Sequence, residues 1–162
     1  MPGIAVITIS DRCAAGQQED TAGPAVARLL AETWPGETIG RGLVPDNADA
    51  IATLLHELCH QEYELIVTAG GTGLGPRDVT PEATRRVIDR EVPGLAEAMR
   101  AGCAEKFAHA WLSRAVVGMR GATLIVNVPG SERGAVENLA VILPLLPHAL
   151  EIAAGGRIHP KG

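Results

Sequence analysis

Residues 65–82 of the chain, LIVTAGGTGLGPRDVTPE, are its most informative stretch of sequence. They begin with a short apolar run, Leu65–Ala69, which is typical of a buried strand. A turn with glycine at four of its six positions, 70–75, follows, and then a lone carboxylate, Asp78. The triplet 80–82 (TPE) is a helix start, with a hydroxyl cap, a proline in the first turn and an acid near the positive end of the helix dipole. This order predicts backbone N–H groups and an acid at the carboxyl end of a sheet, where phosphate-bearing ligands usually bind.

Strand-like and helix-like segments alternate along the rest of the chain. The expected strands are 4–9, 38–44, 65–69, 115–118 and 123–128, and the expected helices are 24–33, 47–61, one from 80, 94–109 and a last one from 135. Pro144 and Pro147 predict a break in that last helix. Strands that alternate with helices predict an α/β fold with a mostly parallel sheet and helices on both faces. We expect one domain over residues 1–156 and a loose tail over 157–162.

The composition argues against several classes of function. The chain has 162 residues, a net charge of −5 and only 2% aromatic residues, so we expect no nucleic-acid partner and no base-stacking surface. Its cysteines, Cys13, Cys59 and Cys103, form no CxxC pair and favour a reducing cytoplasm over a disulfide framework or a cysteine zinc site. The amino terminus lacks the basic region of a signal peptide, and no run of about 18 uncharged apolar residues predicts a membrane span.

The glycine-rich turn allows two interpretations. Glycine lets the backbone take positive φ and approach a ligand closely, and it leaves N–H groups free to form an anion-binding nest. The spacing matches neither a Walker A loop, since no Gly-Lys-Ser/Thr follows, nor GxGxxG, since Pro76 occupies the third glycine position. The turn is therefore either structural or a phosphate loop. Asp78 is likewise either a Mg²⁺ ligand on a polyphosphate or a cap-like group for the helix at Thr80.

Polar turns follow two other expected strands. Residues 10–12 (SDR) come after the first strand, and residues 129–131 (PGS) come after the last. In a parallel sheet these turns converge on the same edge as the glycine turn. Taken alone, Ser10 and Ser131 are ordinary turn or cap residues, and Asp46 is either a further acid at this edge or an N-cap. The convergence of three such turns is the stronger indication of a site.

Residues 56–60 (HELCH) match the HExxH pattern of zinc proteases. On a helix, the apolar residues of the segment 51–59 form one stripe, and His56, Glu57 and His60 lie away from it. The motif is therefore expected to face solvent, and no downstream GxxH supplies a third ligand. A zinc hydrolase acting through His56 and His60 is the least favoured of three functional hypotheses.

Several ordered blocks of sequence carry a resemblance to a known family. They are 7–12 (ITISDR), 44–46 (VPD), 68–84 (TAGGTGLGPRDVTPEAT), 89–94 (DREVPG), 112–114 (LSR) and 124–131 (LIVNVPGS). With these blocks the chain resembles the molybdopterin-binding domain of molybdenum cofactor biosynthesis, and within that family the molybdopterin adenylyltransferases. The amino-terminal domain of gephyrin is a relative. The resemblance covers nearly the whole chain, which makes it far more specific than a single glycine loop.

The resemblance implies a three-layer α/β/α sandwich and a homotrimer. The implied reaction is the transfer of AMP from ATP, with Mg²⁺, to the terminal phosphate of molybdopterin, which yields adenylyl-molybdopterin and pyrophosphate. A partner, the molybdenum-insertion enzyme of the same pathway, would then insert molybdate. The implied protein is cytoplasmic, with no nucleic-acid or membrane partner.

By the same resemblance, particular positions of this chain acquire roles. Asp78 and Asp46 match the family's two essential acidic positions, and Asp78 is the expected metal ligand. The positions that match the loop holding the ligands' phosphates are Gly70, Gly71, Thr72 and Gly73. Further binding positions match at Ser10, Asp11, Ser113, Gly130 and Ser131.

Two departures from the family pattern bear on the pterin contacts. Gly75 stands where relatives often carry a hydroxyl residue, and Glu132 would be repulsive beside a phosphate. A sister branch of the family binds pterin without clear adenylyltransferase activity and tends to lose the RDVTPE string, which this chain keeps at 77–82. We therefore expect the enzyme, with a non-catalytic pterin-binding or scaffold module of the same fold as the second hypothesis.

Overall fold

The structure is a computed structural model that describes residues 3–156. Its strands are β1 (Ile4–Ile9), β2 (Ile39–Val44), β3 (Leu65–Ala69), β4 (Arg90–Glu91), β5 (Val117–Arg120) and β6 (Thr123–Val128). Its α-helices are α1 (Asp11–Ala14), α2 (Ala22–Thr33), α3 (Ala48–His60), α4 (Thr80–Val87), α5 (Pro93–Ala104), α6 (Glu132–Ile142) and α7 (Leu146–Ala153). Two 3₁₀ helices are η1 (Ala108–Leu112) and η2 (Leu143–Leu145). The tail expected at 157–162 lies outside the described residues.

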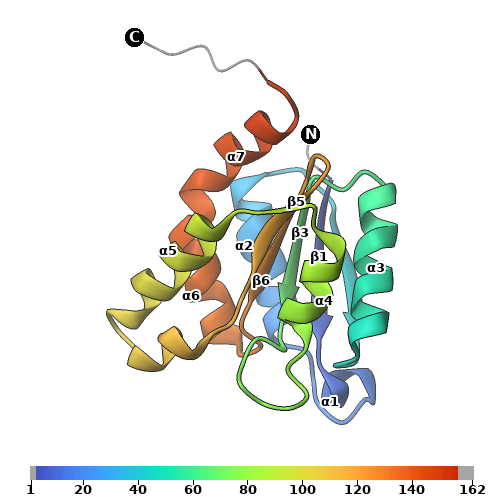
Figure 1. Cartoon of the computed structure of the whole chain (residues 1–162), viewed down its shortest axis with the longest axis vertical. Helices are drawn as coiled ribbons and strands as arrows, with labels where there is room; N and C mark the ends of the chain where they lie inside the picture. The colour runs from blue at the N-terminus through green and yellow to red at the C-terminus, as the bar shows by residue number, and fades with distance from the viewer. Residues whose placement is uncertain (1–2, 157–162) are drawn as a thin grey trace.

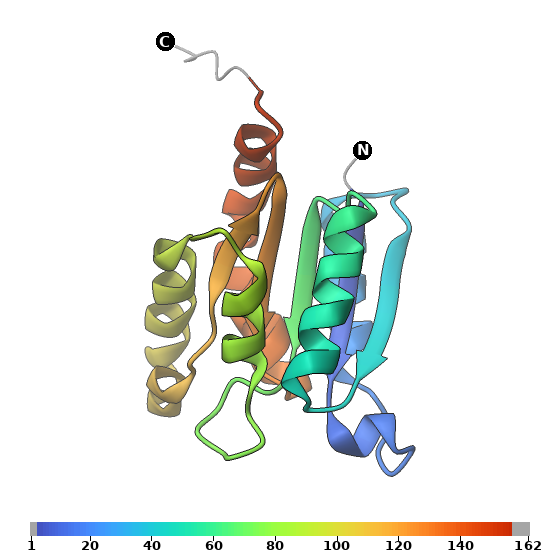
Figure 2. The same cartoon turned by 45° about the vertical axis from the view of Figure 1, so that its right-hand side comes forward.

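One six-stranded sheet runs through the middle of the molecule in the order β2-β1-β3-β6-β5-β4. β2, β1, β3 and β6 are parallel, with Ile9 opposite Val44 and Ala69 opposite Val128 at their carboxyl ends. β5 is antiparallel to β6, because a tight turn joins the two strands directly, and β4 is antiparallel to β5. Helices α3 and α4 cover one face, and α2, α5 and α6 cover the other, as Figure 1 and Figure 2 show. The expected α/β class, the mostly parallel sheet and the three layers are confirmed.

Two apolar layers hold the helices to the sheet, and the side chains of β1 alternate between them. Ile4 and Val6 pack in the layer with α2 and α6, whereas Ala5, Ile7 and Ile9 pack in the layer with α3 and α4. Every residue of β1 is buried, and the same is true of β3 and β6. Burial on both faces explains why these strands are continuous apolar runs. The same burial fixes the positions of the strand ends, where the polar turns begin.

The helix expected over 94–109 ends earlier than predicted. α5 stops at Ala104, because its buried positions, Ala96, Met99 and Cys103, end there and the residues that follow are largely exposed. A helix without a further apolar face has nothing to pack against the sheet. The separate 3₁₀ helix η1 takes the place of the last expected turn.

The strand expected over 115–118 also lies further along the chain, at β5. Val116 is buried but outside the ladder, because its N–H donates to the side-chain oxygen of Asn127 at 3.1 Å. The Asn127 N–H in turn donates to the Val116 carbonyl at 3.1 Å. Gly121, with φ of +56°, makes the hairpin turn, so β5 extends up to it.

The helix starts agree with the sequence only in part. α3 is capped by Asn47, whose side chain accepts a backbone N–H at 2.9 Å. The hydroxyl cap expected at Thr80 is wrong, because Thr80 is already the first residue of α4 and its hydroxyl donates to the Gly70 carbonyl at 2.9 Å. α6 begins at Glu132 rather than at 135. The expected break near Pro144 is present as η2.

One helical stretch, Glu132–Ala153, is long and apolar enough to cross a membrane by length and composition alone, with a mean hydropathy of 1.4. In the fold this stretch lies against the sheet, and Ala135, Leu139 and Ile142 are fully buried in the core. Core helices pass the same test, so the stretch is weak evidence for a membrane segment.

Candidate functional site

The carboxyl ends of β1, β2, β3 and β6 bring four turns together at one edge of the sheet, which we call the carboxyl edge (Figure 1). The Ser10 N–H donates to the Val44 carbonyl, and the Gly70 N–H donates to the Val128 carbonyl, each at 3.0 Å. Gly70 has φ of +120°, and a Cβ there would lie 2.1 Å from the Ile9 carbonyl oxygen. Only glycine fits this close approach. The turns that follow these strands are therefore packed against one another.

Asp46 and Asp11 link two of these turns through reciprocal hydrogen bonds. The Asp11 N–H donates to Asp46 Oδ2 at 2.9 Å, and the Asp46 N–H donates to Asp11 Oδ1 at 3.0 Å. A hydrogen bond from Arg77 Nε to Asp11 Oδ2 lowers the pKa of Asp11. The pKa of Asp46 is raised, mainly by burial and further by the neighbouring Asp11 and Asp78 carboxylates. Asp46 is not the cap of α3, since Asn47 has that role, and it is instead a partly buried acid at the carboxyl edge.

The glycine loop, residues 70–78, closes around the Asp78 side chain. A Cβ on Gly73 would lie 2.9 Å from Asp78 Oδ2, and a Cβ on Gly75 would lie 2.8 Å from the same oxygen. The Gly75 N–H donates to that oxygen at 2.9 Å. Side chains at positions 73 and 75 would displace the Asp78 carboxylate, so glycine at both positions allows the carboxylate to lie against the loop.

A second carboxylate approaches the same loop. A Cβ on Gly71, where φ is +68°, would lie 3.1 Å from Asp46 Oδ1. Among the described residues, Asp46 and Asp78 each accept a backbone N–H with one carboxylate oxygen, and no hydrogen bond engages the other. Within the same part of the chain, the N–H groups of Gly71, Thr72 and Gly73 donate to no protein acceptor. Free N–H groups beside two acids can hold an anion together with its cation.

Two hollows at the carboxyl edge share a wall formed by Gly71, Asp78 and Gly130. The Ser131 hollow has a volume of about 400 Å³, and its other lining residues include Thr72, Gly73, Phe107, Leu112, Ser113 and Ser131. The Ser10 hollow has a volume of about 150 Å³, and its other lining residues include Ser10, Glu19, Asp20 and Asp46. The first is partly apolar, whereas the second is lined by acids.

Most of the site residues expected from the sequence line one hollow or both. They are Ser10, Asp46, Gly71, Thr72, Gly73, Asp78, Ser113, Gly130 and Ser131. Asp11 and Gly70 line neither, since Asp11 is bonded to Asp46 and Arg77, and Gly70 packs on the strand ends. Glu132, expected to repel a phosphate, lines neither hollow but lines a third one that shares Glu19, Asp20 and Thr21 with the Ser10 hollow. Ser131 caps α6, so the positive end of that helix opens on the Ser131 hollow.

Arg114 is a residue of this site that received no role from the sequence. Its N–H donates to the Thr72 carbonyl, its Nε to the Gly73 carbonyl and its Nη2 to the Asp78 carbonyl, each at 2.8 Å. The one indication in the sequence was that Arg114 lies in the block 112–114, which matches the family. A sequence does not show that backbone carbonyls lie within reach of a guanidinium.

The HELCH segment lies at the opposite edge of the sheet. His56, Cys59 and His60 line a hollow of about 530 Å³ together with residues that precede β3 and β6. In the range 3–156 no three His, Cys, Asp or Glu side chains are placed to hold a metal ion. This hollow shares no lining residue with the two hollows of the carboxyl edge.

The chain is similar to known proteins over nearly its whole length. The family described as probable molybdopterin binding domain matches residues 5–148, which include all four turns. The molybdenum cofactor synthesis protein cinnamon of Drosophila melanogaster is 40% identical over 148 residues, which make up 91% of this chain and 25% of that protein. The chain thus spans about a quarter of the length of that relative. The molybdopterin adenylyltransferase of Helicobacter pylori strain J99 is 36% identical over 155 residues, which make up 94% of this chain and 88% of that protein.

A solved structure agrees with the sequence relatives. The molybdopterin biosynthesis enzyme MoaB of Thermus thermophilus has a TM-score of 0.85 and 46% sequence identity, with 96% of this chain and 98% of that chain covered. The chain therefore belongs to the family of probable molybdopterin-binding domains.

Proposed function

We propose that the chain is a molybdopterin adenylyltransferase of molybdenum cofactor biosynthesis. A phosphate oxygen of molybdopterin forms a bond to the α-phosphorus of ATP. The bond from that phosphorus to the oxygen shared with the β-phosphate breaks, and pyrophosphate leaves with that oxygen. The product is adenylyl-molybdopterin. The relative from Helicobacter pylori, which carries this activity in its name, supports the choice of substrates.

The position of Asp78 in the wall between the two hollows is the observation that carries the proposal. A transfer between two substrates needs two binding spaces that open on one reacting point. The Ser131 hollow, at about 400 Å³, lies within the usual range for small-molecule sites. In the Ser10 hollow Asp20 is paired with Arg41, but Glu19, Asp46 and Asp78 also line it, and these acids would repel a bare phosphate that has no cation beside it.

The two acids of the site fit Mg²⁺. In proteins this ion is usually held by one or two carboxylates together with substrate phosphates, rather than by an all-protein cage. Asp78 and Asp46 would hold it, each with the carboxylate oxygen that no described residue engages. When bound, the ion would neutralise the phosphates and the charge that develops on the leaving pyrophosphate.

The chain needs no strong general base for this reaction, because the phosphate of molybdopterin is already ionised at neutral pH. Repulsion between two anionic reactants is the main obstacle, and fixed dipoles reduce it. The free N–H groups of Gly71, Thr72 and Gly73 and the amino end of α6 at Ser131 provide such dipoles. These groups would bind the phosphates and orient them for in-line transfer.

The test is a turnover assay with molybdopterin and ATP, in the presence and absence of Mg²⁺. We expect pyrophosphate release that requires all three, and a product with the mass of adenylyl-molybdopterin. Molybdopterin binding without pyrophosphate release would contradict the proposal and identify the non-catalytic pterin-binding module instead.

We further propose that the chain works as a cytoplasmic homotrimer that passes its product to the molybdenum-insertion enzyme. Phe107 and Trp111 each have 60% of their surface exposed and offer apolar area to another copy. Cys13, Cys59 and Cys103 are free thiols, which suits a reducing compartment. Light scattering should give the mass of three chains of 16.9 kDa. A single-chain mass at micromolar concentration would contradict the trimer.

A further inference from the structure

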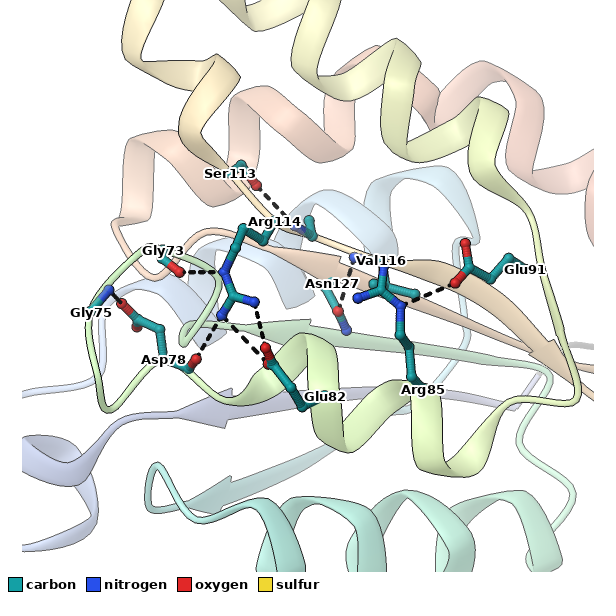
Figure 3. Close-up of polar contacts among 11 residues, drawn as sticks. Gly73, Gly75, Asp78, Glu82, Arg85, Glu91, Ser113, Arg114, Val116 and Asn127 are labelled. Atoms are coloured by element: carbon teal, nitrogen blue, oxygen red, sulfur yellow. Dashed lines mark hydrogen bonds and ion pairs between the residues drawn. The ribbon is translucent and has the colours of Figure 1, made fainter.

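The Arg114 guanidinium joins the glycine loop to helix α4 (Figure 3). Its Nε donates to the Gly73 carbonyl and its Nη2 donates to the Asp78 carbonyl, both at 2.8 Å. Its Nη1 pairs with the Glu82 carboxylate on α4. The main-chain N–H of Arg114 donates to the Thr72 carbonyl at 2.8 Å. Arg114 is thus hydrogen-bonded to the loop on both sides of the exposed segment between Gly73 and Asp78.

Little else holds that segment. Residues 74–77 are exposed, and Leu74 has 67% of its surface in solvent. The bonds inside the segment join Gly75 and Asp78, whose N–H donates to the Gly75 carbonyl at 3.0 Å. Among the described residues, the other side-chain polar interaction that joins the segment to the rest of the chain is the ion pair of Arg77 with Asp11, in which both side chains are well exposed. Exposed ion pairs hold a loop weakly.

The segment that carries Arg114 is itself held by hydrogen bonds to α5 and β6. Arg100 Nη1 donates to the Ser113 carbonyl at 3.2 Å and to the Ala115 carbonyl at 2.9 Å. Val116, two residues after Arg114, donates its N–H to Asn127 Oδ1, as Figure 3 shows, and Asn127 is fully buried in β6. The segment that carries Arg114 is therefore tied to the sheet core, and the glycine loop is tied to Arg114.

Glu82 completes the contact and gives a role to the last residue of the RDVTPE string. Its hydrogen bond with Arg114 lowers the pKa of Glu82 and raises the pKa of Arg114, so both groups stay ionised at neutral pH. A guanidinium presents several N–H groups in a rigid plane, whereas a lysine ammonium is a point charge on a flexible stem. A lysine at this position can keep the ion pair with Glu82 but cannot hold both loop carbonyls in the same plane.

We infer that Arg114 is a positioning residue, which fixes the Asp78 carboxylate at the shared wall by holding the carbonyls of Gly73 and Asp78, with Glu82 as its counter-ion. The inference rests on the proposed adenylyl transfer, because Asp78 is placed there as the acid that holds the cation. Its consequence is that a change at Arg114 lowers turnover without touching either substrate.

The experiment compares Arg114→Lys and Glu82→Gln with a matched control, Arg85→Lys. Arg85 also lies on α4 and pairs with a glutamate, Glu91, but that pair is remote from the loop (Figure 3). Pyrophosphate release gives kcat and the KM for ATP, and hydrogen–deuterium exchange without substrates reports on residues 73–78. We expect Arg114→Lys to lower kcat about 100-fold, with a much smaller change in KM, since the defect lies in the transition state. Glu82→Gln should lower kcat less, and both variants, unlike the control, should exchange faster over 73–78.

A kcat for Arg114→Lys within about twofold of the Arg85→Lys value would overturn the inference, because a misplaced catalytic group costs far more. A lowered melting temperature with unchanged kcat would also overturn it, since that result describes a merely structural contact. If Arg114→Lys does not fold, the same comparison between Glu82→Gln and the control decides. Absence of turnover in the unmodified chain refutes the proposed function, and the exchange data then decide separately whether Arg114 holds the loop.

Discussion

Replacing Gly73 by alanine tests whether the glycine spacing serves the Asp78 carboxylate. The new Cβ would lie 2.9 Å from Asp78 Oδ2, whereas ordinary contacts begin at 3.4 Å. The oxygen must therefore move by about 0.5 Å, which is the tolerance of a functional constellation. The move weakens the hydrogen bond from Gly75, so we expect a loss of about 1 kcal/mol in the free energy of unfolding. Turnover should also fall, because a displacement of about 1 Å costs about 100-fold in rate, and half that distance should cost about 10-fold.

The assay is pyrophosphate release with molybdopterin and MgATP, beside thermal unfolding of the same preparations. Gly94→Ala in α5 is the matched control, because no atom lies within 4 Å of its added Cβ. The control should keep full turnover and should not lose stability, as alanine favours helix over glycine. Equal turnover of the Gly73→Ala and Gly94→Ala variants would show that the Asp78 carboxylate does not depend on glycine at position 73.

Three further predictions concern other parts of the chain. Asp46→Asn should raise the melting temperature at about pH 7 and lose that gain at about pH 3. The pKa of Asp46 is higher in the folded chain than in the unfolded chain, so its ionisation destabilises the fold as pH rises through the folded-state pKa. Below the unfolded-state pKa the carboxyl is neutral in both states, and asparagine then brings no gain. An equal gain at both pH values would contradict this. Asn127→Ala should lower the free energy of unfolding by about 3 kcal/mol in urea titrations, because it leaves the buried Val116 N–H and the Thr68 and Thr84 hydroxyls without their hydrogen-bond partner. A loss under about 1 kcal/mol would contradict this prediction. His56→Ala and His60→Ala should leave turnover unchanged, and stoichiometric zinc in metal analysis of the purified chain would revive the hydrolase hypothesis.

The buried strands were the most predictable part of the fold. Ile4–Ile9, Leu65–Ala69 and Thr123–Val128 have the bounds expected from the sequence, because a strand covered on both faces must be an unbroken apolar run. The start of β5 could not be predicted in this way. It depends on the hydrogen bond between Val116 and the Asn127 side chain, two residues that only the folded chain brings together.

The location of the site followed from topology, whereas its internal contacts did not. The strand order places the turns at Ser10, Asp46 and Gly130 beside the glycine loop, as expected when parallel strands end at one edge. From the sequence, the glycines form either a structural turn or an anion-binding loop. The structure adds that they leave space for two carboxylates, and that Arg114 holds the loop from a distant segment. Such contacts depend on side-chain directions that composition and spacing do not encode.

Pyrophosphate release by the Asp78→Asn variant directly tests whether Asp78 holds the cation at the wall between the two hollows. Asparagine keeps an oxygen that can accept the Gly75 N–H, so the fold should persist while the charge is lost. The matched control is Asp49→Asn, a carboxylate 84% exposed in its ion pair with Arg86 and not among the residues that line either hollow. We expect Asp78→Asn to lose about 1000-fold in turnover, the upper end of the loss when one preorganised electrostatic group is removed from an active site, with Asp49→Asn unchanged. Comparable turnover in the two variants would contradict the placement of the cation at Asp78.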